Sequence, residues 1–322
     1  MLEIKNLTIG YRSGRDVTRV VEGINATLHP GELVCLLGAN GKGKSTLLRT
    51  LAGTQDALEG SVRIDGKVVQ DISKRELARL LSLVYTDNTL AGGLSVRELV
   101  ELGRHPHTGF LGILSDEDRR RVQDAMQSVG IAHKSSSFVA ELSDGERQKA
   151  MIARAVAQET PVIFLDEPTA FLDVASKSDT MRLLHDLARD EQKAILLSTH
   201  DVSQALSLAD RLWIIDRDGE FVSGLTEDMV LNGSLQRLFE DTRTQFDITS
   251  GAFVSRGKYT RTVSLECTDL TVRRWLTNAL HRNGFEISEE AKVCIRYENG
   301  LYSVATHSCT SVEELLGRLL GE

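Results

Sequence analysis

The feature that most constrains this chain is a glycine-rich run, Gly38-Ala39-Asn40-Gly41-Lys42-Gly43-Lys44-Ser45, which fits the pattern GxxxxGK[ST]. It follows a short apolar run, 33–37, and precedes a helical pattern that begins at Thr46. Glycines let backbone amides turn toward a phosphate chain, and the N-terminus of the next helix adds a positive dipole. The run therefore predicts a loop that binds the phosphates of a nucleotide.

The side chains of this loop have distinct expected roles. Lys44 should reach the β- and γ-phosphates of ATP, and the hydroxyl of Ser45 should ligate Mg²⁺. The cofactors expected here are thus ATP and Mg²⁺, held by Gly38, Asn40, Gly41, Gly43, Lys44, Ser45 and Thr46.

A second stretch, 162–167, is an apolar strand pattern that ends in two acids, Asp166 and Glu167. In a protein with a phosphate-binding loop, the first acid belongs near Mg²⁺ and the second is placed to polarise an attacking water. Two acids in this place can also be an exposed turn. With the loop upstream, they predict hydrolysis of ATP.

Composition narrows the class of protein. Of 322 residues, 41% are hydrophobic and 26% are charged, as in soluble globular proteins. The net charge of −8 argues against non-specific binding to nucleic acid, so no nucleic-acid partner is expected. No apolar run is long enough to cross a bilayer. The cysteines form no CxxC pair and predict neither a zinc site nor a disulfide framework.

The chain changes character near residue 240. Before it, apolar strand patterns at 33–37, 161–165, 194–198 and 212–216 alternate with helical patterns, which predicts an α/β core with a mainly parallel sheet. From about 258 a smaller α+β pattern appears, with a hairpin signal at Glu298-Asn299-Gly300. We expect domains at 1–240, with a helical subdomain at about 88–158, and at 241–322, an accessory domain of unknown role.

A third motif, Leu142-Ser143-Asp144-Gly145-Glu146, precedes a helical pattern that runs to about Gln158. The order of the phosphate-binding loop, this motif, the Asp166-Glu167 strand and Ser198-Thr199-His200-Asp201 resembles the ATP-binding cassette (ABC) family over roughly residues 1–240. The resemblance implies a P-loop NTPase core with a β-rich N-terminal part and a helical subdomain.

The resemblance also implies roles for matching positions. Tyr11 would stack on adenine, Asp173 lies in the loop that links two ATP sites, and His200 would sense the γ-phosphate. Ser143 and Gly145 would contact ATP held by an opposite subunit. Cassettes of this family work as head-to-tail dimers, so a chain with one cassette implies a homodimer in which Glu167 and His200 are catalytic.

A further segment, 94–107, ends in Gly103-Arg104-His105-Pro106-His107 and resembles importers for iron–siderophores, haem and cobalamin. It implies a peripheral ATPase subunit at the cytoplasmic face of the cell membrane, bound to integral-membrane permease subunits and served indirectly by a solute-binding protein. In that family the segment docks with the permease; otherwise it only packs the helical subdomain. The alternative function is a non-transport or low-turnover ABC-type ATPase with a regulatory or signalling role.

Three positions depart from the family pattern. Asp144 replaces the commoner glycine and should face solvent or a neighbouring base such as Lys149, and Lys42 is either a charge near the phosphates or a solvent-facing lysine. After the strand pattern at 82–84, no glutamine occurs between Gln70 and Gln123, although the family places a Mg²⁺-contacting glutamine there. Thr86 or Asp87 is the candidate replacement as a metal ligand, and turn formation is the other interpretation.

Overall fold

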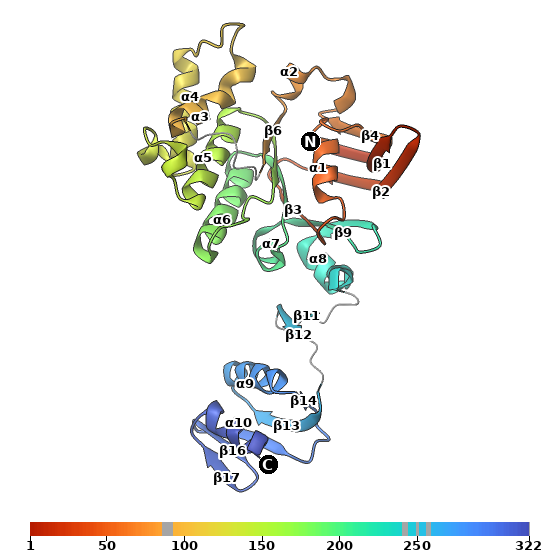
Figure 1. Ribbon diagram of the computed structural model, residues 1–322, viewed down its shortest axis with the longest axis vertical. Coiled ribbons are helices and arrows are strands. Elements are labelled where there is room, and N and C mark those ends of the chain that lie inside the picture. The colour runs from red at the N-terminus through yellow and green to blue at the C-terminus, as the bar shows by residue number, and fades with distance from the viewer. Residues whose placement is uncertain (86–92, 240–243, 249–250, 256–258, 322) are drawn as a thin grey trace. The chain divides into compact units, whose positions relative to one another are not determined.

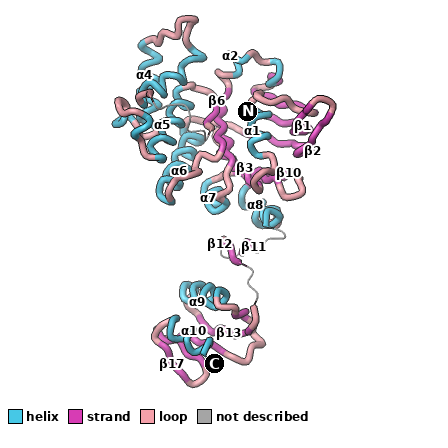
Figure 2. Tube along the Cα trace, viewed as in Figure 1, coloured by secondary structure: helices cyan, strands magenta, loops and turns pink. Residues whose placement is uncertain are grey.

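The computed structural model describes residues 1–85, 93–239, 244–248, 251–255 and 259–321 (Figures 1 and 2). The chain divides into two compact units, Met1–Glu240 with Ile248–Gly251, and Asp241–Asp247 with Ala252–Glu322. Within the described ranges, no helix is both long enough and apolar enough to cross a membrane.

The larger unit is built on a six-stranded sheet with the strand order β10-β9-β3-β8-β7-β6. Neighbouring strands are parallel except β9 and β10. The four strands expected from apolar runs occur within one residue of their predicted ends. The strands are β3 (Leu33–Gly38), β6 (Leu81–Val84), β7 (Val162–Asp166), β8 (Ala194–Ser198), β9 (Arg211–Ile215) and β10 (Phe221–Leu225).

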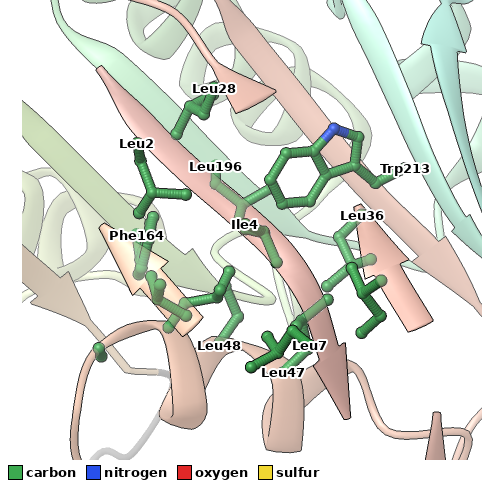
Figure 3. Close-up of a cluster of buried hydrophobic side chains, with 14 of the residues drawn as sticks. Leu2, Ile4, Leu7, Leu28, Leu36, Leu47, Leu48, Phe164, Leu196 and Trp213 are labelled. Atoms are coloured by element: carbon green, nitrogen blue, oxygen red, sulfur yellow. The ribbon is translucent and has the colours of Figure 1, made fainter. Parts of the chain in front are cut away.

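A second, antiparallel sheet of four strands forms the β-rich N-terminal part, in the order β2-β1-β4-β5. Its strands are β1 (Leu2–Ser13), β2 (Asp16–Leu28), β4 (Glu59–Ile64) and β5 (Lys67–Val68). Figure 3 shows Leu47 and Leu48 of α1 (Lys44–Leu51) in one buried cluster with Ile4 and Leu7 of β1 and with Phe164 and Trp213 of the six-stranded sheet. This buried cluster fixes α1, and therefore also the loop that precedes it.

The helical subdomain lies on the opposite side of β6 from α1 (Figure 1). Its helices α3 (Val96–Glu101), α4 (Asp116–Ser128) and α5 (Asp144–Ala157) each begin with a complete capping box, at Ser95, Ser115 and Ser143. The short helices η3 (Leu102–His107), η4 (Ala132–Lys134) and η5 (Val139–Glu141) connect them.

Helix η3 carries the segment Gly103–His107, and its arginine turns inward. Arg104 Nε lies 2.9 Å from Asp118 Oδ1, and their side chains are 5% and 11% exposed. Arg104 Nη1 also donates to the carbonyl of Ala157 at 2.7 Å and to Glu159 Oε2 at 2.6 Å. Arg104 therefore holds η3 against α4 and α5, and any docking surface in this segment must use its other residues.

The remaining helices of the larger unit complete its layers. They are η1 (Val69–Asp71), α2 (Lys74–Leu77), α6 (Val174–Asp190), α7 (Val202–Leu208), α8 (Thr226–Leu231) and η6 (Ser234–Phe239). Helices α6 and α7 both contact β3, in the middle of the six-stranded sheet. Helices on the sheet explain why its strands are apolar on both faces.

The smaller unit has a five-stranded sheet in the order β14-β13-β15-β16-β17, covered on one face by α9 (Leu270–Arg282) and α10 (Val312–Gly321). Asn299 and Gly300 have φ angles of 51° and 83°, and they form the predicted turn between β15 and β16. Sequence patterns did not predict β14 or β17, which have three residues each. The strands of the sheet are β13 (Arg261–Cys267), β14 (Phe285–Ile287), β15 (Cys294–Glu298), β16 (Leu301–Val304) and β17 (His307–Cys309). A separate hairpin is formed by β11 (Thr244–Asp247) and β12 (Ala252–Ser255).

Candidate functional site

The phosphate-binding loop leaves β3 at Gly38 and ends where α1 begins at Lys44. Gly41 and Gly43 have φ angles of 78° and 103°, in the left-handed region that glycine adopts most easily. A Cβ on Gly43 would also lie 2.6 Å from Cγ1 of Val20. Backbone conformation and packing together therefore require glycine at position 43.

Lys44 is buried, and its ammonium group is turned toward the loop. Its Nζ donates to the carbonyls of Gly38 at 2.8 Å and Ala39 at 3.4 Å. Burial lowers the pKa of Lys44, and the nearby charges of Glu167 and Asp166 oppose that shift. A partly desolvated cation in a loop of backbone amides favours an anionic ligand, such as a triphosphate.

Asp166 and Glu167 lie at the carboxyl end of β7, next to the end of β8. Ser198 at that end donates its hydroxyl to Asp166 Oδ1 at 2.6 Å and accepts the backbone N–H of Glu167 at 3.0 Å. Glu167 has a φ of 48°, a conformation that costs a non-glycine residue about 1–3 kcal/mol. The bonds to Ser198 hold this strained backbone in place, so both carboxylates have a defined direction.

His200 follows β8 and meets Glu167. Its Nδ1 lies 3.2 Å from Glu167 Oε2, and the imidazole is exposed. The backbone N–H of Asp201 donates to the hydroxyl of Thr199 at 3.0 Å, and Asp201 caps α7. The two residues predicted to be catalytic are therefore adjacent and accessible, as a water-activating pair must be.

Tyr11 comes from β1 and reaches the first turn of α1. Its hydroxyl lies 2.6 Å from Thr46 Oγ1, and its ring is half exposed. The structure thus brings the residue expected to stack on adenine next to a residue expected to hold phosphate.

Ser143, Gly145 and Asp173 form a separate group at the starts of α5 and α6. Ser143 Oγ donates to Glu146 Oε2 at 3.0 Å, and Asp173 accepts the backbone N–H of Ser176 at 2.9 Å. A Cβ on Gly145 would lie 3.1 Å from Ser176 Oγ, so the two helix starts touch. Ser143 and Asp173 are thus helix caps in this chain, whatever ligand they also meet.

The residues present fit a bound Mg²⁺. Asp166 at the end of β7 and Ser45 in the first turn of α1 offer one carboxylate and one hydroxyl, both hard oxygen ligands. Mg²⁺ beside nucleotides is held by one or two protein oxygens, substrate phosphates and water. Among the described residues, no group of three His, Cys, Asp or Glu side chains could hold a metal ion by itself.

Two of the positions that depart from the family pattern have contacts in the structure. Asp144 pairs with Arg147 at 2.9 Å rather than with Lys149, because α5 places residues three apart on one face. Lys42 donates to the carbonyl of Arg217 at 2.5 Å, within the protein. Thr86 and Asp87 lie outside the described residues.

Sequence reasoning gave no role to Ser198. Its position at the end of an otherwise apolar strand pattern was the available signal, and the structure places it opposite Asp166 in the parallel register.

A groove with a cavity of about 620 Å³ lies between α5, β6, α2 and η3, apart from the loop and the acids. Apolar side chains such as Leu77, Leu81 and Leu102 line it, together with two cations, Lys74 and Arg154. The groove is the second candidate site of the larger unit.

Two family models match the chain: ABC transporter over residues 21–170, and iron ABC transporter C-terminal domain over residues 260–320. An uncharacterized ABC transporter ATP-binding protein of Methanocaldococcus jannaschii is 36% identical over 79% of this chain and 86% of its own length. The ferric enterobactin transport ATP-binding protein of Escherichia coli is 36% identical over 73% and 85%. The iron(3+)-hydroxamate import ATP-binding protein of Bacillus subtilis is 32% identical over 74% and 87%.

Solved structures agree with the sequence comparisons. A metal-chelate type ABC transporter in an inward-facing conformation matches with a TM-score of 0.64 and 26% identity, over 79% of this chain and 95% of that one. A dimeric cassette in a post-hydrolysis state, bound to ADP and phosphate, matches with a TM-score of 0.61 and 28% identity, over 70% and 99%. With the loop, the paired acids and these matches together, the chain belongs to the ATP-binding proteins of ABC transporters and is an ABC-type ATPase.

Proposed function

We propose that this chain is the ATP-hydrolysing subunit of a multi-component importer for iron–siderophore complexes, haem or cobalamin. It works as a head-to-tail homodimer, bound to permease subunits at the cytoplasmic face of the cell membrane. The cargo class is supported by relatives whose names specify ferric enterobactin and iron(3+)-hydroxamate, and by the match of residues 260–320 to an iron transporter domain.

The observation that carries the proposal is the separation of two sets of expected ATP ligands within one chain. Lys44 and Glu167 lie at the carboxyl edge of the six-stranded sheet, whereas Ser143 begins α5, across β6 from α1 (Figure 1). Among the described residues, no hydrogen bond or ion pair links Ser143 or Gly145 to the loop 38–45. A second copy turned head to tail would bring its own α5 terminus to the nucleotide and complete the site.

The chemistry in such a site follows from the side chains present. Glu167 accepts a proton from a water whose oxygen attacks the γ-phosphorus, and the bond to the β–γ bridging oxygen breaks to release ADP and phosphate. Lys44 offsets the charge on the phosphates, and His200, next to Glu167, contacts the γ-phosphate. Ser45 and Asp166 would hold Mg²⁺, which would supply further positive charge to the phosphates.

Coupling to a permease would use the second candidate site. The groove lined by Leu77, Leu81 and Leu102 is apolar and open to a partner segment. In the same subdomain, Phe110 is fully exposed at 104%, and Leu111 and Ile113 are also exposed, which is unusual for apolar side chains without a partner. These surfaces favour a protein partner over a freely soluble ATPase.

Mixing two defective variants tests the head-to-tail arrangement. Lys44→Ala removes the phosphate contact, and Ser143→Arg blocks the other half of the site. We expect each variant alone to hydrolyse little ATP and their mixture to regain part of the rate, because a mixed dimer holds one complete site. A mixture as inactive as its components, although mixed dimers form, would contradict this arrangement. Uptake of labelled ferric siderophore, haem and cobalamin by cells with and without the chain would identify the cargo.

A further inference from the structure

Lys42 has a contact that neither phosphate binding nor exposure to solvent accounts for. Its Nζ donates to the carbonyl of Arg217 at 2.5 Å, so the side chain joins two loops that lie 175 positions apart in the sequence. Lys42 stands between Gly41 and Gly43, whose φ angles are 78° and 103°. The contact therefore acts on the part of the phosphate-binding loop that has the most conformational freedom.

The turn that carries Arg217, residues 216–220, joins β9 to β10 and begins beside the phosphate-binding loop. Ile215, the last residue of β9, pairs in parallel register with Gly38, the last residue of β3. A Cβ on Gly38 would lie 2.8 Å from the carbonyl oxygen of Ile215, so the two backbones are in close contact there. The register of β3 and β9 thus places the 216–220 turn within reach of the loop.

Val20 of β2 packs against both segments. A Cβ on Gly43 of the loop would lie 2.6 Å from Val20 Cγ1, and a Cβ on Gly219 of the turn would lie 3.1 Å from the carbonyl oxygen of Val20. The loop and the turn therefore share a neighbour on β2. The bond from Lys42 to Arg217 joins them directly and completes one packed unit.

Asp216 gives the 216–220 turn a fixed shape. Its side chain is buried, and Oδ1 accepts the backbone N–H groups of Asp218 and Glu220, each at 2.9 Å. The backbone of Asp216 also donates to the carbonyl of Glu220 and accepts from the N–H of Gly219. An aspartate that accepts from amides just after it stabilises a turn. The carbonyl of Arg217 consequently has a defined direction and is a firm acceptor for Lys42.

We propose that Lys42 is a positioning residue: its bond to the 216–220 turn holds the phosphate-binding loop in one conformation before the nucleotide arrives, and Lys42 does not contact the phosphates itself. A glycine-rich loop loses conformational freedom when a ligand orders it, and restricting the loop beforehand lowers that cost. Loss of the bond should weaken nucleotide binding and leave the chemical step at Glu167 unaffected. The inference goes beyond the proposed function, because it depends on neither the cargo nor a second subunit.

Binding of a non-hydrolysable ATP analogue and steady-state hydrolysis of ATP, both with the full-length chain, test the inference. Lys42→Ala should raise the Kd for the analogue and the KM for ATP about 3–10-fold, the scale of one exposed hydrogen bond, with kcat within about twofold. Lys42→Arg keeps a long side chain with N–H donors and should bind within about twofold of the unaltered chain.

Lys193→Ala is the matched control. Lys193 Nζ also donates to a carbonyl, that of Thr160 at 3.1 Å, but it does so where β7 and β8 begin, at the opposite edge of the sheet from the phosphate-binding loop. Lys193→Ala should therefore bind the analogue as the unaltered chain does.

A double-variant cycle separates anchoring from direct contact with phosphate. Asp216→Ala removes the acceptor that fixes the turn, so it should weaken binding of the analogue, and Lys42→Ala should add little to that loss. Gly219→Ala, at a φ of 86°, disturbs the same turn and replaces Asp216→Ala if that variant does not fold. If the losses from Lys42→Ala and the turn variant multiply, Lys42 contacts phosphate directly and the inference is wrong.

Three other outcomes would overturn the inference. Unchanged binding by Lys42→Ala would mean that its bond to Arg217 does not affect the loop, and unchanged binding by both turn variants would mean that the turn is not the anchor. A fall in kcat at constant KM would place Lys42 in the chemical step. By contrast, an unaltered chain that binds ATP and no permease would contradict the proposed function alone.

Discussion

Two charged pairs, one from each compact unit, lie in opposite environments. In the larger unit, Arg104 and Asp118 lie 2.9 Å apart with side chains only 5% and 11% exposed. In the smaller unit, Arg296 and Glu266 lie 2.6 Å apart on the open face of the sheet, and each is 60% exposed. A buried pair depends on its exact partners, whereas an exposed pair contributes little because water can replace either partner.

Two serine hydroxyls, one in each unit, show the same contrast between a buried and an exposed polar group. Ser198 is fully buried and serves both Asp166 and Glu167, which has a positive φ. Ser264, on the outer face of β13, reaches only the carbonyl of Val293 at 3.5 Å. A buried hydroxyl therefore supports a strained residue where ATP hydrolysis is expected, whereas the hydroxyl of Ser264 supports no comparable site in the smaller unit.

Matched substitutions of glutamate should show the largest difference between the units. Glu167→Gln should lower the rate of ATP hydrolysis about 10²–10⁴-fold, the usual contribution of a general base, while ATP still binds. Glu266→Gln in the smaller unit should leave the rate unchanged. Steady-state phosphate release measures both. A rate for Glu167→Gln within a few-fold of the unaltered chain would remove Glu167 from the chemical step.

A core substitution that leaves a cavity should destabilise only the unit in which it is made. Leu280 is fully buried in the smaller unit, and Leu280→Ala should cost that unit about 2–5 kcal/mol. Calorimetry should then show the smaller unit unfolding at a lower temperature, with ATP hydrolysis retained. Leu36→Ala, in the core beside α1, should instead destabilise the larger unit. Equal losses in both transitions after Leu280→Ala would mean that the units do not unfold independently.

Loss of the buried hydroxyl of Ser198 should lower stability and the rate of ATP hydrolysis more than loss of the exposed hydroxyl of Ser264. Ser198→Ala leaves the N–H of Glu167 and one oxygen of Asp166 without their side-chain partner, which costs about 1–3 kcal/mol of unfolding free energy. The rate of hydrolysis should fall about tenfold, the equivalent of one such bond in the transition state. Ser264→Ala is the control in the smaller unit. If both serine variants kept the original rate, Ser198 would have only a structural role.

Local sequence patterns predicted most of the fold because their causes are local. Strand β7 forms from the apolar run expected at 161–165, and Asn299-Gly300 makes the expected turn. Side-chain partners distant in sequence could not be predicted in the same way. The bonds of Ser198 to Asp166 and of Arg104 to Glu159 join residues 32 and 55 positions apart, and only the packed sheet and helices bring them together.

The buried pair should also give the larger unit a distinct response to acid. The hydroxyl and N–H of Ser115, with Arg104, lower the pKa of Asp118 to about 2, from an ordinary 3.8. A carboxyl group with a lowered pKa in the folded state stabilises fully above its ordinary pKa, and it loses that contribution as the pH falls toward 2. The free energy of unfolding of the larger unit should therefore fall more steeply with decreasing pH between about pH 4 and pH 2.

Asp118→Asn should flatten that part of the profile and lower stability at pH 7, although Glu159 remains as a partner for Arg104. Denaturant unfolding at a series of pH values measures the slope. Glu266→Gln is the comparison in the smaller unit, because its partner Arg296 is open to water. If Asp118→Asn left the acid slope of the larger unit unchanged, the buried pair would not be what distinguishes the two units, and the difference in burial would have no energetic consequence.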